Sequence, residues 1–139
     1  MDALRLAHFG VLCAWSGVLL VEFLVESLGH DDAALDMAAR IHYWIDILIE
    51  IPLVLAVLVT GTLLSAHVWP FTRLHWIKIA AGLVAITLNL TCCGLVVARY
   101  RARGNACAVR KLHRGVRLSV IGVPFGAVAA YVGLAYFSR

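Results

Sequence analysis

The chain has 139 residues, of which 63% are hydrophobic and 14% are charged, and its formal net charge is +4. A soluble domain of this length has too high a surface-to-volume ratio to bury so much apolar surface, so the composition excludes an ordinary soluble protein and indicates a membrane protein. The length leaves no room for a separate soluble domain, and we expect a single domain over residues 1–139.

Four apolar segments are long enough to cross a bilayer as helices. We expect spans at about residues 4–28, 41–66, 74–98 and 116–137. A polar segment follows the first span, and Asp31 or Asp32 in it could cap a short helix. Short connections between successive spans predict an all-α fold, an integral membrane antiparallel four-helix bundle.

Pro52 lies inside the second predicted span. Proline has no backbone N–H and removes one helical hydrogen bond. We therefore expect the second span to bend at this position.

Charge is distributed unevenly along the chain. All eight acidic residues lie at or before Glu50, whereas seven of the twelve lysines and arginines lie between Arg99 and Arg117. In a membrane protein such a cluster marks the cytoplasmic side, which predicts a cytoplasmic loop at 99–117 and both termini outside. Since Tyr100 is its one aromatic residue, we expect no nucleic-acid partner.

An outer polar layer is expected from the first and third spans. His8 lies near the start of the first span, and His75 and Lys78 lie near the start of the third. Two imidazoles from different helices commonly hold a b-type haem, so His8 and His75 are candidate ligands of the haem iron and Lys78 a partner for a propionate. The alternative is that these side chains only extend to the lipid headgroups.

An inner polar layer is expected from the first and second spans, together with His113, Arg114 and Arg117 at the start of the fourth. Glu22 and Glu26 are four residues apart, and His42, Asp46 and Glu50 repeat the same spacing, so each set shares a helix face. Histidine and carboxylates in this pattern can ligate Zn²⁺ or Fe²⁺ or relay protons. The alternative is an ion-pair network with the arginines of the basic cluster. Glu50 lies deepest and is the best candidate for a functional ionisable group.

The middle of the third span carries an amide and two adjacent thiols. Asn89 is expected to bridge helices through a buried hydrogen bond. Cys92 and Cys93 suit soft metals, although buried free cysteine usually behaves as a small hydrophobic residue.

Short motifs occur at defined positions in the first three spans. They include His8, Trp15 and Gly17 in the first span, Pro52 and Gly61 in the second, and His75, Lys78 and the step from Cys92 and Cys93 to Gly94 in the third. In this pattern the chain resembles the HemJ-type protoporphyrinogen oxidases and, more distantly, the CopD-like copper-resistance membrane proteins.

The resemblance implies a bacterial inner-membrane protein associated with haem b that oxidises a hydrophobic porphyrin-like substrate. It assigns functional roles to His8 and Lys78, with His75 beside them. The chain differs from the family in two ways: one extra residue separates His75 from Lys78, and Asn89 stands where the family tends to carry a histidine.

Three hypotheses therefore stand at the level of sequence. The first is a haem-associated oxidoreductase, acting as an oxidase or a small membrane cytochrome, with a homodimer to enlarge the haem pocket. The second is a metal or proton translocating or sensing protein built on Glu22, His42, Asp46 and Glu50. The third is a structural subunit of a membrane complex.

Overall fold

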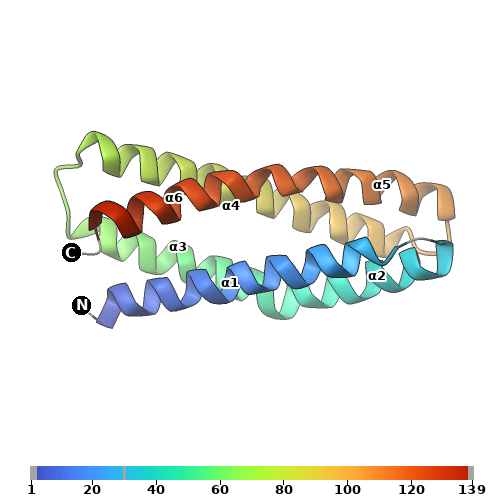
Figure 1. Cartoon of the computed structure of the whole chain (residues 1–139). Coiled ribbons are helices and arrows are strands. Elements are labelled where there is room, and N and C mark those ends of the chain that lie inside the picture. Colours follow the sequence, from blue (N-terminus) through green and yellow to red (C-terminus); the bar gives the residue numbers. More distant parts are fainter. Residues whose placement is uncertain (1–2, 30, 138–139) are drawn as a thin grey trace.

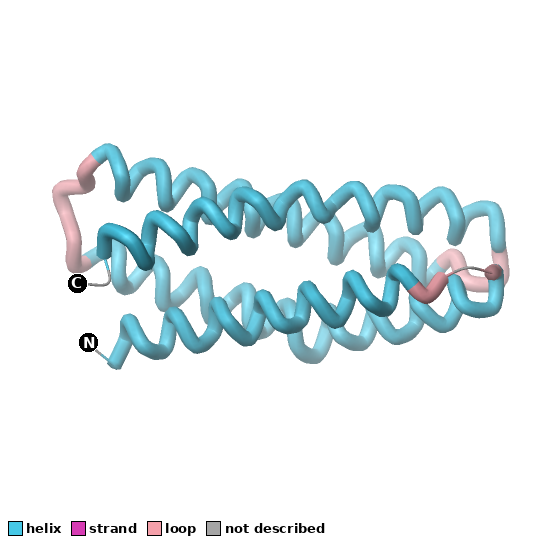
Figure 2. Tube along the Cα trace, viewed as in Figure 1, coloured by secondary structure: helices cyan, strands magenta, loops and turns pink. Residues whose placement is uncertain are grey.

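The computed structural model of the chain describes residues 3–29 and 31–137, and its regular structure over these ranges is helical. Four long helical segments are described, over Ala3–Ser27, Asp32–Ala66, Arg73–Arg101 and Ala106–Ala135. Each is long and apolar enough to cross a membrane. The segment 67–72, the first turn of the helix that begins at Ala3 and the last turn of the helix that ends at Phe137 lie at one end of the molecule, and the turns around 28–31 and 102–105 lie at the other (Figures 1 and 2).

Helix α1 (Ala3–Ser27) leads through a short turn into helix α2 (Asp32–Ile45). The N-cap of α2 is Asp31, whose side chain accepts a hydrogen bond of 2.7 Å from the backbone N–H of Ala34. The polar segment expected after the first span is therefore largely helical. It is ordered because Leu35, Ala38 and Ala39 bury one face of α2.

The second long segment is interrupted by a π-helical turn. This turn, η1 (Asp46–Glu50), follows α2 directly and leads into helix α3 (Ile51–Ala66). The N–H of Ile51 bonds to the carbonyl of Asp46, five residues earlier. Pro52 follows and has no N–H to donate to the preceding turn, and the helix widens to a π turn directly before it.

Helix α4 (Arg73–Arg101) begins at a capping box between Thr72 and His75. After a turn in which Gly104 has a φ of 88°, helix α5 (Ala106–Leu118), the 3-10 turn η2 (Ser119–Ile121) and helix α6 (Gly122–Phe137) form the last segment. Most of the loop expected at 99–117 is therefore helical. Its residues form an amphipathic helix because Val109 and Val116 are buried while its basic side chains point outward.

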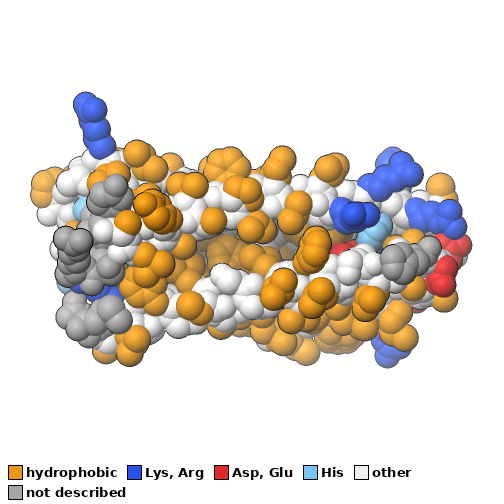
Figure 3. Space-filling model, viewed as in Figure 1, with side chains coloured by type: hydrophobic (Ala, Val, Ile, Leu, Met, Phe, Trp, Pro, Cys, Tyr) orange, Lys and Arg blue, Asp and Glu red, His pale blue; other side chains and the backbone are white. Residues whose placement is uncertain are grey.

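The helices pack mainly as two pairs, α1 against α3 and α4 against α6. Gly122 permits the second contact, because a Cβ there would lie only 3.2 Å from Leu88, whereas a Cβ at Gly126 would make an ordinary contact of 3.8 Å with Ala85. A groove with a volume of about 1390 Å³ runs between these pairs, and its opening lies between α1 and α6 (Figure 3).

Polar and apolar side chains are distributed opposite to the pattern of a soluble protein. Large hydrophobic side chains cover the middle of the visible face, and charged ones gather at its ends (Figure 3). The largest fully buried side chains include Arg99, Glu50 and Asp46. The interior of the bundle therefore holds ionisable groups that are shielded from the surroundings.

Candidate metal centre

Ionisable side chains from several helices meet in the half of the bundle nearest the turns around 28–31 and 102–105. All are buried, with at most 8% of each residue exposed. They are Glu22 and Glu26 from α1, His42 from α2, Asp46 and Glu50 from η1, and Arg99 from α4.

Glu26 forms a bidentate ion pair with Arg99. The guanidinium donates from Nη1 to Oε2 at 2.7 Å and from Nη2 to Oε1 at 2.5 Å. His113 of α5 adds a third contact, with its Nδ1 2.8 Å from Oε2. A carboxylate in a bidentate pair with arginine is ionised and can only accept hydrogen bonds, so Glu26 has a fixed charge and orientation.

Glu26 in turn sets the proton position on His42. The Nδ1 of His42 lies 2.5 Å from Oε1 of Glu26. Because the carboxylate only accepts, Nδ1 is the donor and carries a proton. When the His42 ring is neutral, its Nε2 atom then carries a lone pair. A carboxylate that orients a histidine in this way is the usual outer partner of a metal-bound imidazole.

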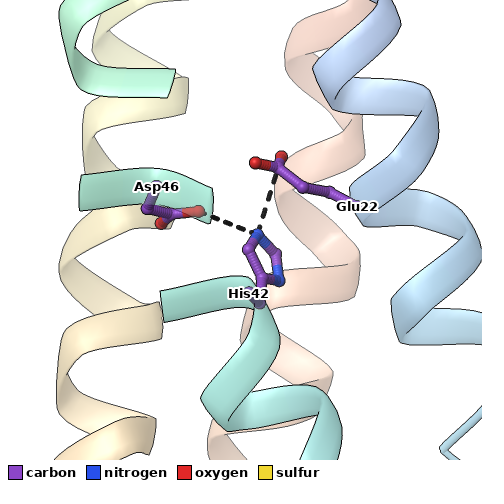
Figure 4. Close-up of side chains that lie close together, drawn as sticks. All are labelled: Glu22, His42 and Asp46. Carbon is purple, nitrogen blue, oxygen red and sulfur yellow. Dashed lines mark ion pairs between the residues drawn. The ribbon is translucent and has the colours of Figure 1, made fainter. Parts of the chain in front are cut away.

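The Nε2 atom of His42 faces two further carboxylates (Figure 4). It lies 3.2 Å from Oδ1 of Asp46 and 3.6 Å from Oε2 of Glu22. These contacts are ion pairs when His42 is protonated. Among the described residues, neither oxygen of Asp46, nor Oε1 of Glu22, nor Nε2 itself has a hydrogen-bond partner. Such unsatisfied buried atoms are costly unless something else binds them.

The three side chains in Figure 4 have the geometry of a cation site. Each offers one ligand atom, and the three atoms lie within 4.8 Å of one another. A nitrogen and two carboxylate oxygens from three buried residues are a ligand set that suits Zn²⁺ or Fe²⁺.

The charge of the cluster also favours a cation. Four buried carboxylates accompany one buried arginine, which leaves a formal charge of −3 when the imidazoles are neutral. Isolated charge is expensive to bury, and a divalent cation would offset most of it.

Glu50 lies one helical turn beyond Asp46 and has different hydrogen-bond partners. Its Oε1 accepts hydrogen bonds from Trp15 Nε1 at 3.1 Å and from Asn89 Nδ2 at 2.6 Å, and its Oε2 lies 3.4 Å from the thiol of Cys93. Asn89 thus bridges two helices as its sequence position predicts. The contact of Trp15 with Glu50 was not predicted, because residues 35 positions apart give no local signal.

Sequence spacing predicted the two faces of this site that α1 and the second segment supply, and it missed Arg99 of α4. His42, Asp46 and Glu50 line the interior together, as their spacing of four residues indicates. Arg99 was assigned to a basic loop, but it is fully buried. Its position in the last turn of an apolar helix, rather than beyond it, was the available signal.

The outer layer lies at the other end of the groove. His8 is buried, with its Nδ1 2.7 Å from Thr60 Oγ1 and its ring against Gly61. The Thr60 hydroxyl donates to the carbonyl of Ala56 at 2.6 Å, so Nδ1 of His8 is the donor to Thr60. When the His8 ring is neutral, its Nε2 atom therefore also carries a lone pair.

The other two outer residues have different surroundings. His75 uses its Nδ1 in the cap of α4, 2.8 Å from Thr72 Oγ1. Lys78 packs against α6, where a Cβ at Gly133 would lie 3.4 Å from its Nζ. Both residues line the same groove as His8. The structure thus brings the outer residues to one groove.

Comparison with known proteins identifies no relative. The chain matches no protein-family model, no curated protein and no solved structure.

Proposed function

We propose that the chain is an integral membrane protein whose four helical segments cross the bilayer in an antiparallel bundle, and that it binds a divalent transition-metal cation at Glu22, His42 and Asp46. The membrane assignment follows from the apolar exterior and the charged ends. The metal assignment depends chiefly on one observation. The Nε2 atom of His42 and both oxygens of Asp46 are buried without a hydrogen-bond partner among the described residues, and Nε2 faces Oδ1 of Asp46 and Oε2 of Glu22.

Aromatic side chains support the position of the bilayer. Trp76 and Phe71 pack edge to face at 5.2 Å near one end, and Tyr43 and Tyr100 stack at 4.0 Å near the other. Twenty-four residues separate Trp76 from Tyr100 on α4, or about 36 Å of helix. Aromatic rings favour the membrane interfaces, and this separation suits a hydrocarbon core of about 30 Å with its interfaces.

The cation site then lies inside the bilayer. Asp46 is one helical turn beyond Tyr43, and Glu50 is one turn deeper. Charged groups at such depth usually mark a pathway or a binding site. The groove reaches Glu22 and His42, so these two ligands border a cavity inside the bundle. Uptake, export or sensing of a transition metal is the function that this arrangement supports.

Zinc binding by the detergent-purified protein tests the proposal. We expect about one Zn²⁺ per chain, and the Asp46→Asn variant to bind at least about tenfold more weakly, a loss of about 1.4 kcal/mol. The matched control is Asp36→Asn, which alters a carboxylate on the same helical segment outside the cluster and should leave affinity unchanged. Wild-type protein that binds no Zn²⁺, or equal losses in the two variants, would refute the proposed function.

A haem-associated oxidoreductase is a second candidate function. It is favoured by the protonated Nδ1 of His8, which leaves Nε2 as a ligand atom, and by the size of the groove that His8 shares with His75 and Lys78. In this candidate, His8 and His75 bind the iron of haem b, Lys78 holds a propionate, and a porphyrin-like substrate is oxidised in the membrane.

An absorption spectrum of the purified protein, oxidised and dithionite-reduced, distinguishes the two candidates. A Soret band with sharp reduced α and β bands that is lost in His8→Ala would establish the haem. A featureless visible spectrum after haem reconstitution would eliminate it and leave the metal proposal intact.

A further inference from the structure

Asp46 belongs to two sets of ligand atoms. The first is the one in Figure 4. The second joins Asp46 to Glu50 and Cys93, and one ligand atom from each again lies within 4.8 Å of the others. All three residues are buried, with Asp46 0%, Glu50 1% and Cys93 5% exposed.

The second set lies deeper in the bundle than the first. Glu50 comes one turn after Asp46 on the second segment, and Cys93 approaches from α4. Trp15 and Asn89 donate hydrogen bonds to Oε1 of Glu50, while Oε2 accepts from the weak thiol donor of Cys93 at 3.4 Å. One carboxylate oxygen is thus fixed in place, and the other is directed toward the thiol and Asp46.

Asp46 supplies an independent indication of a ligand. Both of its oxygens are buried and have no hydrogen-bond partner within residues 3–29 and 31–137. The first set can use one of these oxygens, and the second oxygen remains for a neighbouring position. A carboxylate whose two oxygens lack hydrogen-bond partners can serve two adjacent cation positions.

We propose that Asp46, Glu50 and Cys93 form a second position for a cation, adjoining the first and sharing Asp46, and that this position selects thiophilic divalent cations of the zinc and cadmium class. This inference rests on the proposed function. A cation reaches the deeper position by exchanging His42 and Glu22 for Glu50 and Cys93 while Asp46 stays bound, so one cation is bound at a time.

The ligand chemistry gives the selectivity. Thiolate ligands favour Zn²⁺ and Cd²⁺, whereas Mg²⁺, Ca²⁺ and Mn²⁺ prefer sites made of oxygen ligands alone. Coordination converts the thiol of Cys93 to a thiolate with release of its proton. Cys92 is the natural comparison, because its side chain projects from α4 in a different direction and lines the groove.

Cadmium titration of the full chain tests the second position. A cadmium–thiolate bond gives an ultraviolet charge-transfer band, which we expect in the wild-type protein and in Cys92→Ser but not in Cys93→Ser or Cys93→Ala. We also expect the preference for Cd²⁺ over Mn²⁺ to fall at least tenfold in both Cys93 variants. Zn²⁺ binding that persists in these variants shows that they are folded.

The outcomes separate the two proposals. Zn²⁺ binding that depends on Asp46 but gives no thiolate band with Cd²⁺ overturns the second position and leaves the proposed function standing. A band that survives in Cys93→Ser and disappears in Cys92→Ser also overturns it. A wild-type protein that binds neither Cd²⁺ nor Zn²⁺ overturns both.

Discussion

At the scale of single residues, two arginines make similar contacts in opposite surroundings. Arg99 is fully buried and donates two hydrogen bonds to Glu26. Arg110 also makes two bonds, both of 2.9 Å, to Asp32, but more than half of each of these side chains is exposed. The buried pair connects α1 to α4 and orients His42, whereas the exposed pair lies in water and gains little.

Substitution of each arginine measures this difference. We expect Arg99→Ala to lower the free energy of unfolding by about 3–5 kcal/mol, because it leaves a buried carboxylate unpaired. We expect Arg110→Ala to lower it by about 0–1 kcal/mol. Denaturant titration in detergent micelles, followed by tryptophan fluorescence, gives both values. Similar losses for the two variants would show that the buried pair contributes no more than the exposed one.

Local spacing could predict part of the site. The interval of four residues places His42, Asp46 and Glu50 on one helix face without knowledge of the fold. The partners from other helices depend on how the helices are shifted along one another, and no local pattern encodes this register. Cys93 and Arg99 therefore take their places in the site only when α4 is packed against the second segment.

At the scale of elements, polar helices were harder to predict than apolar ones. The four apolar segments lie within helices, as expected. For the polar stretch 32–40 the sequence predicted at most a short helix capped by Asp31 or Asp32, and Asp31 is indeed the N-cap of α2. The stretch 106–115 was predicted as a loop because it is polar. Both stretches are amphipathic helices that bury a narrow apolar face. The π-helical turn was not predicted either, since Pro52 marks a break in hydrogen bonding but not the form that the break takes.

The π-helical turn gives a prediction of its own. A π turn is one residue wider than an α turn, so its loss would rotate Asp46 by about 100° relative to α3. Pro52→Ala restores an N–H that can complete an α-helical turn. We expect its circular dichroism to show unchanged or slightly higher helix content, and its Zn²⁺ affinity to fall at least about tenfold.

Pro124 provides the control for this experiment. It lies in α6 and is exposed, so Pro124→Ala should leave Zn²⁺ affinity unchanged. Wild-type affinity in Pro52→Ala would mean that the π-helical turn does not position the ligands.

At the scale of the whole molecule, charge sets the expected orientation in the membrane. The basic side chains from Arg99 to Arg117 lie at the end with the turns around 28–31 and 102–105, and we expect this end in the cytoplasm. Cys107 is exposed there, in the first turn of α5. His67 is exposed at the opposite end, after α3.

Thiol labelling tests this orientation. In a variant whose other cysteines are replaced by alanine, a membrane-impermeant maleimide should label Cys107 only after cells are permeabilised. The variant His67→Cys, made with Cys107→Ala, should be labelled in intact cells. The reverse pattern would invert the topology.

The most direct test of the cation site is the coordination of Zn²⁺ itself. X-ray absorption at the zinc edge should be measured on the Zn²⁺-loaded Cys93→Ala protein, which retains the first position alone. We expect nitrogen and oxygen ligands at about 2.0–2.2 Å, with the outer-shell scattering of one imidazole, and loss of that scattering when His42→Ala is added. A spectrum without imidazole, or one whose imidazole survives His42→Ala, would contradict a metal centre built on Glu22, His42 and Asp46.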